Sequence, residues 1–290
     1  MPPPQAVAAV RDALSAAEDA LRAAGCDTPR LDAELLVAHA MGVGREALFM
    51  DPEAGLNSSA SRRAMELVRR RVAREPVAYI LGTKGFRHIE LRVDRRVLIP
   101  RPETEGLVEQ VLELAAGAGG IAVDVGTGSG AIALALASEG VFDRVIATDV
   151  SRDALAVASL NAARLAGALR TSVEFRQGSL LAPVRDVHAA VIVSNPPYIA
   201  YHEAAELPAS VRDWEPTLAL LSGAEGMAAT MAIIRGAADL LDEGGILALE
   251  VDARRASLAA ESLAVDPRYR EICVRLDLAG RERFVTARRS

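Results

Sequence analysis

The sequence predicts an α/β fold with a seven-stranded, mainly parallel sheet. From residue 105 onward, short strand-like runs alternate with segments of helical periodicity. Strands that alternate with helices are joined by right-handed crossovers, which place them parallel in one sheet with helices on both faces. The last two runs have no helix between them, so we expect them to pair antiparallel. The runs are residues 121–125, 144–148, 172–176, 189–193, 246–251, 271–276 and 283–287.

A smaller helical domain is predicted to precede the sheet, over residues 1–76. Helical periodicity starts near residue 6, a second helix follows Thr28, and a third extends over residues 57–75. The third helix is rich in arginine, which is typical either of a solvated face or of a docking surface for an acidic or RNA-bound partner. These arginines are Arg62, Arg63, Arg69, Arg70, Arg71 and Arg74.

Residues 77–104 are predicted to form a linker that contains a β-hairpin. Two strand-like runs, 86–93 and 96–99, flank the turn that we expect at residues 94–95. Two prolines follow within three residues and stiffen the end of the linker. The α/β domain would then comprise residues 105–290.

Composition and charge restrict the function. The chain has 290 residues and a net charge of −6, which disfavours a protein that follows the backbone of naked DNA. Aromatic residues make up only 3%, which disfavours stacking platforms for single-stranded nucleic acid. Cys26 and Cys273 are far apart and the histidines lack metal-ligand spacing, so we expect reduced thiols and no metal site. Because no membrane-spanning segment or signal peptide is recognisable, we expect a soluble protein of the cytoplasm, not bound to membranes.

A rigid polar turn follows the apolar run 189–193. It consists of Asn195, Pro196, Pro197 and Tyr198. The prolines end the strand and hold the neighbouring carbonyl groups in fixed directions. In an open parallel sheet, ligands bind at the carboxyl ends of the strands. An amide, fixed carbonyls and an aromatic ring together predict a pocket for a flat, neutral group that carries an NH2; the alternative is a surface Asn-Pro turn.

A glycine-rich loop follows the first predicted strand. Gly126, Gly128 and Gly130 have G-x-G-x-G spacing, which lets the backbone approach a ligand closely before a helix begins. The spacing differs from the G-x-G-x-x-G of dinucleotide enzymes and suits a nucleoside with a small charged tail. The second strand ends at Asp149, whose carboxylate can accept both ribose hydroxyls. The two features predict a nucleoside site beside the amide site.

The order of motifs resembles that of the peptide chain release factor glutamine methyltransferases, over most of the chain. The most specific motif is Ile-Pro-Arg-Pro-Glu-Thr-Glu, and the full set is residues 76–82, 99–105, 124–130, 195–198, 215–216, 219–220 and 226–227. The resemblance implies a Rossmann-like methyltransferase sheet. It also implies transfer of a methyl group from S-adenosylmethionine to the side-chain amide nitrogen of the glutamine in the Gly-Gly-Gln motif of class 1 release factors. Residues 1–76 would dock this substrate.

The resemblance implies a cofactor site at the glycine loop, with Asp149 on the ribose. Ser179 and Leu180 would border the adenine, and Asn195 would touch both cofactor and substrate. Ser179 stands where such enzymes usually carry aspartate, and Leu180 where an aromatic residue is common, so we expect weaker adenine recognition. The expected cofactor-binding residues of the loop are Asp124, Gly126, Thr127, Gly128, Ser129 and Gly130.

The catalytic residues implied by the resemblance are Asn195, Pro196 and Tyr198, and together with Pro197 they would hold the glutamine. An amide nitrogen is a poor nucleophile, so the site must orient it in line with the methyl carbon and sulfur. The Asn195 side-chain oxygen and the Pro196 carbonyl can each accept one N–H of the substrate amide. Tyr198 would pack against the amide plane, or alternatively under the loop.

Three other functions stay open at this point. A glutamine methyltransferase that acts on a ribosomal protein shares much of the pattern, but usually differs at residues 99–105. A DNA adenine methyltransferase can share the Asn-Pro-Pro-Tyr turn, but it must grip a duplex, which needs a basic recognition region that this acidic chain lacks. A nucleoside-binding regulator would leave the turn unexplained.

Overall fold

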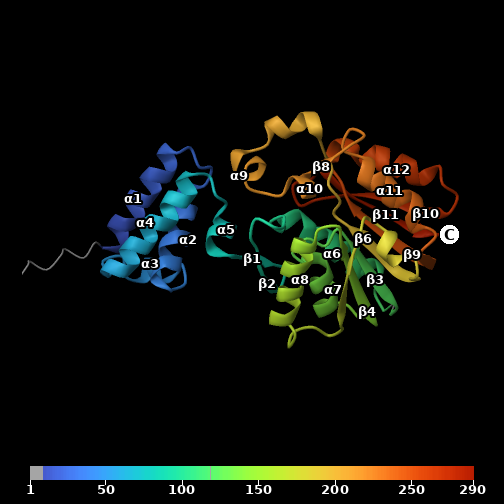
Figure 1. Ribbon diagram of the computed structural model, residues 1–290, viewed down its shortest axis with the longest axis horizontal. Helices are drawn as coiled ribbons and strands as arrows, with labels where there is room; N and C mark the ends of the chain where they lie inside the picture. The colour runs from blue at the N-terminus through green and yellow to red at the C-terminus, as the bar shows by residue number, and fades with distance from the viewer. Residues whose placement is uncertain (1–8, 118) are drawn as a thin grey trace, which may run out of the picture. The chain divides into compact units, whose positions relative to one another are not determined.

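The chain folds into two compact units in the computed structural model, which describes residues 9–117 and 119–290 (Figure 1). One unit holds the chain up to Gly82 together with Pro208–Trp214, and the other holds Thr83–Leu207 and Glu215–Ser290. The predicted helix start at residue 6, and the residues on which the absence of a signal peptide depends, lie outside the described residues. Within the described ranges, no helix is long and apolar enough to cross a membrane.

The first unit is helical. Its helices are α1 (Val10–Ala23), α2 (Pro29–Met41), α3 (Ala47–Met50), α4 (Ser58–Val72), α5 (Val77–Leu81) and α9 (Ala209–Arg212). Asn57 caps α4, because its side-chain oxygen accepts the backbone N–H of Ala60. Leucines such as Leu21, Leu36 and Leu67 fill the core between α1, α2 and α4.

The arginines of α4 do not all lie on a free surface. Arg71 is buried on the inner face of the helix, where its Nε donates to Asp32 Oδ2 over 2.7 Å. Arg70 pairs with Glu75, and Arg74 donates to a backbone carbonyl. Of the six arginines, only Arg62, Arg63 and Arg69 are exposed, so a solvated face or a docking surface would be limited to these three.

The hairpin of the linker region lies earlier in the chain than predicted. Its strands are β1 (Thr83–Phe86) and β2 (Ile89–Arg92), which pair antiparallel around a turn at Arg87 and His88. Arg87 adopts a φ of 49° and is held by two hydrogen bonds of 2.7 Å to the Glu139 carboxylate. The predicted hairpin around residues 94–95 is wrong: the Val97 N–H donates to the Asp94 carbonyl over 3.1 Å in a turn there, but residues 96–99 form no strand. An ion pair with the distant Glu139, and not a typical turn residue, stabilises the observed hairpin turn.

Helix α6 (Pro102–Leu114) begins inside the predicted linker. Proline is well tolerated in the first helical turn, where an N–H would have no partner within the helix. The negative charges of Glu103 and Glu105 in this turn interact favourably with the positive end of the helix dipole. The residues of the Ile-Pro-Arg-Pro-Glu-Thr-Glu motif therefore include a helix start and not only a linker. This places Thr104 in the first turn of α6.

The second unit contains the predicted seven-stranded sheet. Its order is β10-β11-β9-β6-β3-β4-β5. Strands β9, β6, β3, β4 and β5 are parallel. Strand β11 pairs antiparallel with β10, as expected from the missing helix, and also with β9. The strands are β3 (Ile121–Val125), β4 (Arg144–Asp149), β5 (Val173–Gln177), β6 (Ala189–Ser194), β9 (Leu241–Glu250), β10 (Tyr269–Leu276) and β11 (Glu282–Arg289).

Helices cover both faces of this sheet (Figure 1). On β6, Val191 and Val193 face a core shared with α6 and α7 (Ala131–Glu139), while Ile192 faces a core shared with α11 (Ala228–Ala237) and α12 (Ala256–Ala264). Helix α8 (Arg152–Arg164) packs on β4 and β5. The chain leaves β3 toward β4 and returns to β6 on the other side, so the strand order reverses between β3 and β6. A ligand site is expected at such a reversal.

Candidate active site

The carboxyl ends of three strands are joined by hydrogen bonds at the reversal. Val125 of β3 lies opposite Ser194 of β6, and the Ser194 hydroxyl donates to the Val125 carbonyl over 2.6 Å. The backbone N–H groups of Gly126 and Thr127 both donate to the Thr148 carbonyl of β4, each over 2.9 Å. The glycine loop and the Asn195 turn therefore start from fixed, neighbouring points.

A cavity of about 440 Å³ opens at this edge of the sheet. Among its walls are apolar side chains, including Val150, Leu221 and Ala228. The cavity brings together eight of the residues that the sequence singled out, which are Gly126, Gly128, Asp149, Ser179, Leu180, Asn195, Pro196 and Pro197.

The glycines of the loop have two different roles. Gly126 and Gly128 have φ angles of 78° and 56°, and a Cβ added to either would meet no atom within 4 Å. Because both residues line the cavity, that space is open to a ligand. Gly130 instead allows α7 to pack, since a Cβ there would lie 3.0 Å from Leu134 Cδ1 and 3.3 Å from Ala158 Cβ. The first two glycines thus form a cradle that a side chain would fill.

Asp149 is placed to hold a hydroxyl-bearing ligand. Its Oδ2 accepts the N–H of Gly128 over 2.9 Å, and its Oδ1 accepts the N–H of Ser151 over 2.9 Å. These bonds fix the carboxylate beside the glycine loop, and each oxygen keeps a further lone pair that can accept a hydrogen bond from a hydroxyl group. The cradle, Asp149 and the apolar wall fit a nucleoside with a small charged tail.

Asp124 supports the loop from below. It is fully buried, and its Oδ2 accepts the Thr127 hydroxyl over 2.7 Å and the Ala133 N–H over 3.1 Å. Burial raises the pKa of this carboxyl to about 7. Asp124, Thr127, Ser129 and Gly130 do not line the cavity, so their direct contact with a cofactor stays a prediction.

The far side of the cavity is the Asn195 turn. Asn195 Nδ2 donates to the hydroxyl of Thr104 over 3.0 Å. Tyr198 does not line the cavity. Burial raises the pKa of its phenol to about 12. A direct contact between Tyr198 and the substrate stays a prediction.

Glu215 joins two motifs that are far apart in the sequence. Its side chain is buried, and it accepts the Ile99 N–H over 3.1 Å and the Arg101 guanidinium over 2.6 Å. The next residue, Pro216, lines the cavity at the start of α10 (Thr217–Leu220). Both motifs are visible in the sequence, but no spacing rule connects them; the available signal was an acidic residue in one and an arginine in the other.

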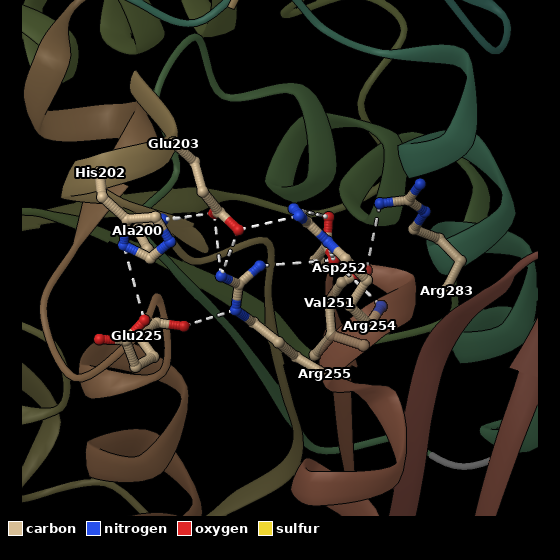
Figure 2. Close-up of polar contacts among 9 residues, drawn as sticks. All are labelled: Ala200, His202, Glu203, Glu225, Val251, Asp252, Arg254, Arg255 and Arg283. Atoms are coloured by element: carbon tan, nitrogen blue, oxygen red, sulfur yellow. Dashed lines mark hydrogen bonds and ion pairs between the residues drawn. The ribbon is translucent and has the colours of Figure 1, made fainter. Parts of the chain in front are cut away.

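A buried ion-pair network holds the segment that leaves the turn (Figure 2). Arg255 Nη2 lies 2.9 Å from both carboxylate oxygens of Glu203, which also accepts the N–H of Ala200 over 2.8 Å. Burial opposes the charge, but hydrogen bonds from Ala200 and Arg255 outweigh it and lower the pKa of Glu203. Arg255 donates in addition to the Glu225 carbonyl. Arg254 and Arg255, which follow β9, thus form one side of this network.

The cavity wall that was expected to border the adenine holds the two departures from the usual pattern. Leu180 adopts a φ of 49°, an uncommon conformation for a branched side chain. It follows Gly178, whose own φ is 157° and where a Cβ would lie 2.5 Å from Pro183 Cγ. Ser179 and Leu180 both face the cavity, and neither supplies the negative charge of an aspartate.

An α/β sheet with this strand order, a glycine cradle and an acidic residue at the end of the next strand define a methyltransferase domain. Two family models match the chain, the PrmC N-terminal domain over residues 12–82 and the methyltransferase small domain over residues 100–210. The chain belongs to the family of release factor glutamine methyltransferases, as two full-length relatives show.

Two relatives show membership of this family, and one solved structure is similar in fold. A release factor glutamine methyltransferase of Cereibacter sphaeroides is 42% identical over 285 residues, which cover 96% of this chain and 97% of the relative. One of Mycolicibacterium smegmatis is 42% identical over 300 residues, with 97% and 98% covered. A methyltransferase structure from Pyrococcus furiosus has a TM-score of 0.51 at 19% identity, covering 79% of this chain and 98% of that one, and supports the fold alone.

Proposed function

We propose that this protein transfers a methyl group from S-adenosylmethionine to the side-chain amide nitrogen of the glutamine in the Gly-Gly-Gln motif of class 1 release factors. The main observation in support of this proposal is that Asn195 lines the same cavity as the cradle of Gly126 and Gly128. The proposed amide site and the proposed nucleoside site would therefore be continuous. The names of the full-length relatives support the choice of a release factor glutamine as the acceptor.

The cradle and Asp149 would hold the cofactor. S-adenosylmethionine supplies, when bound, a methyl group on a positively charged sulfur. Gly126 and Gly128 present backbone where a side chain would block the ligand, and Asp149 offers lone pairs to the ribose hydroxyls. Ser179 and Leu180 would border the adenine through one hydroxyl and an apolar contact.

The Asn195 turn would orient the acceptor. The Asn195 side-chain oxygen and the Pro196 carbonyl each accept one N–H of the glutamine amide, which directs the nitrogen lone pair toward the cofactor and disperses the positive charge that develops on nitrogen. No anionic base has to touch the nitrogen, since the proton of the methylated, positively charged amide is acidic enough to leave to water. Tyr198 would hold the turn in shape from behind.

The reaction would take place in the cytoplasm. The helical unit that contains α1 to α5 would dock the release factor. Its exposed arginines Arg62, Arg63 and Arg69 suit an acidic or RNA-bound partner. A ribosomal protein is the second candidate substrate, because it presents the same acceptor group. Duplex DNA is disfavoured by the net charge of −6.

The test is methyl transfer from labelled S-adenosylmethionine to four acceptors in parallel. They are a class 1 release factor, the same factor with the Gly-Gly-Gln glutamine replaced by alanine, ribosomal proteins and duplex DNA. We expect label on the intact release factor alone. Label on the alanine variant or on DNA, or on ribosomal proteins at a higher rate, would overturn the proposal.

A further inference from the structure

Asn195 is connected to a buried carboxyl by a chain of two hydrogen bonds. Its Nδ2 donates to Thr104 Oγ1 over 3.0 Å, and the Thr104 hydroxyl donates to Glu250 Oε2 over 2.7 Å. Thr104 and Glu250 are buried, with exposed fractions of 5% and 1%. Neither residue lines the cavity, and Asn195, which does, connects them to it.

The chain has a direction that depends on Glu250. An ionised carboxylate only accepts hydrogen bonds, so Thr104 must give its single proton to Glu250. The Thr104 oxygen can then only accept, and only the NH2 end of Asn195 can pair with it. If Glu250 is protonated, it can donate to Thr104, and Thr104 can donate to the Asn195 oxygen. The NH2 end would then be the one left for the cavity.

We propose that Glu250, acting through Thr104, is a positioning residue that sets which end of the Asn195 amide faces the methyl acceptor. This deepens the proposed function and rests on it, because the acceptor amide presents N–H groups, which the oxygen of the Asn195 side chain can accept and its NH2 group cannot. An NH2 facing an NH2 cannot orient the nitrogen lone pair. The Asn195 oxygen faces the methyl acceptor when Glu250 is ionised.

Glu250 is surrounded by charged and titratable groups from several elements. Burial raises the pKa of its carboxyl to about 7, the Thr104 hydroxyl and the positive charges of Arg283 and Arg101 lower it, and Glu103 raises it further. Tyr198 lies near enough for its own pKa to be raised by the Glu250 charge. The protonation state of Glu250 therefore changes in the neutral range, and the orientation of Asn195 should change with it.

Substitutions of Thr104 test the chain with a matched control. Thr104→Val breaks it, Thr104→Ser keeps the hydroxyl, and Thr230→Val removes a fully buried hydroxyl that has no hydrogen-bond partner. We expect Thr104→Val to lower kcat about tenfold or more at pH 8, with the Kd for S-adenosylmethionine changed less than about twofold. Thr104→Ser and Thr230→Val should stay within about threefold of wild type. Normal kcat in Thr104→Val, or equal losses in the valine and serine variants, would overturn the proposal.

The pH profile distinguishes positioning from a merely structural role. At saturating methyl donor and release factor, wild-type kcat should fall as the pH drops through about 7, because Glu250 becomes protonated. In Glu250→Gln the side chain does not titrate, so this part of the profile should be flat. The same acidic fall in both proteins would contradict the inference.

A readout without turnover separates this inference from the proposed function. In 15N-labelled protein saturated with S-adenosylmethionine, the Asn195 side-chain NH2 signal is identified by its loss in Asn195→Ala. Its chemical shift should titrate near pH 7 in wild type and stay constant in Glu250→Gln. A constant shift in wild type would overturn the positioning role even if release factor is methylated. A titrating shift in a protein that methylates no release factor would support the chain of hydrogen bonds and contradict the proposed function.

Discussion

Gly226 lies against the carbonyl oxygen of Tyr198, so closely that a Cβ on Gly226 would be 2.3 Å from that oxygen. The same Cβ would be 2.8 Å from Arg255 Nε. Gly226 also has a φ of 84°, a conformation that L side chains rarely adopt. The turn that ends at Tyr198 is thus backed by a position that accepts glycine alone. This accounts for the Gly226-Met227 motif without any contact to a ligand.

Gly226→Ala should displace the turn and lower both stability and turnover. The added methyl meets a backbone oxygen, which cannot move aside as a flexible side chain can, so we expect a fall in kcat of about tenfold or more. Gly244→Ala is the control, because its φ is 74° and its Cβ would meet no atom within 4 Å. It should show only a conformational penalty of about 1–2 kcal/mol. Equal effects of the two variants on Tm and kcat would show that the close approach is unimportant.

Asp149→Ala should weaken cofactor binding. The ribose hydroxyls of the cofactor would lose the carboxylate that is proposed to accept them, and the Gly128 N–H would lose its acceptor. We expect the Kd for S-adenosylmethionine, measured by calorimetry, to rise by about tenfold or more. Asp153→Ala, an exposed change close by in α8, should leave the Kd unaltered. An unchanged Kd in Asp149→Ala would refute the ribose role.

Asp124 should make stability depend on pH. Burial raises the pKa of this carboxyl from 3.8 to about 7. A pKa that is higher in the folded than in the unfolded protein gives stability that is complete at low pH and is lost as the pH rises through about 4 to 7. Asp124→Asn removes this titration and keeps an oxygen for Thr127 and Ala133. Its free energy of unfolding relative to wild type should rise by on the order of 2–3 kcal/mol from pH 5 to pH 8. The same difference at both pH values, in denaturant titrations, would contradict the role of Asp124.

The ion-pair network behind the turn allows a comparison of two adjacent arginines (Figure 2). The Arg255 side chain is 10% exposed and that of Arg254 is 63% exposed, and both contact Glu203. Arg255→Met leaves Glu203 buried without its main partner, so we expect a loss of about 3 kcal/mol or more in unfolding free energy. Arg254→Met should cost less than about 1 kcal/mol. Similar losses in the two variants would show that burial does not control the strength of these pairs.

The sheet could be predicted from the sequence because its signals are local. Strands such as β3 and β6 are apolar runs, β5 alternates apolar and polar residues, and the glycine loop and Asp149 mark the ends of β3 and β4. The reversal of strand order between β3 and β6 follows from right-handed crossovers only once the pairing is known. The sequence therefore predicted that the nucleoside site and the amide site are adjacent. It could not predict the hydrogen bond from the Ser194 hydroxyl to the Val125 carbonyl, which depends on the pairing of β3 with β6.

The features that sequence analysis missed depend on long-range contacts. The turn at Arg87 is stabilised by Glu139, 52 residues further on, so local turn propensities could not locate it. Thr104 lies 91 residues from Asn195 and 146 residues from Glu250, and no spacing rule connects them. The buried pair of Arg71 and Asp32 was missed for the same reason, because an arginine in an arginine-rich helix is normally exposed.

The most direct test of the proposed function is single-turnover methyl transfer by Asn195→Ala. With enzyme and S-adenosylmethionine in excess over a class 1 release factor, the variant should transfer the methyl group about 100-fold or more slowly than wild type. Its Kd for S-adenosylmethionine, measured in parallel, should change little, because the glycine cradle and Asp149 are untouched. A variant that binds the cofactor normally and transfers the methyl group at the wild-type rate would contradict the role of Asn195 and with it the whole mechanism.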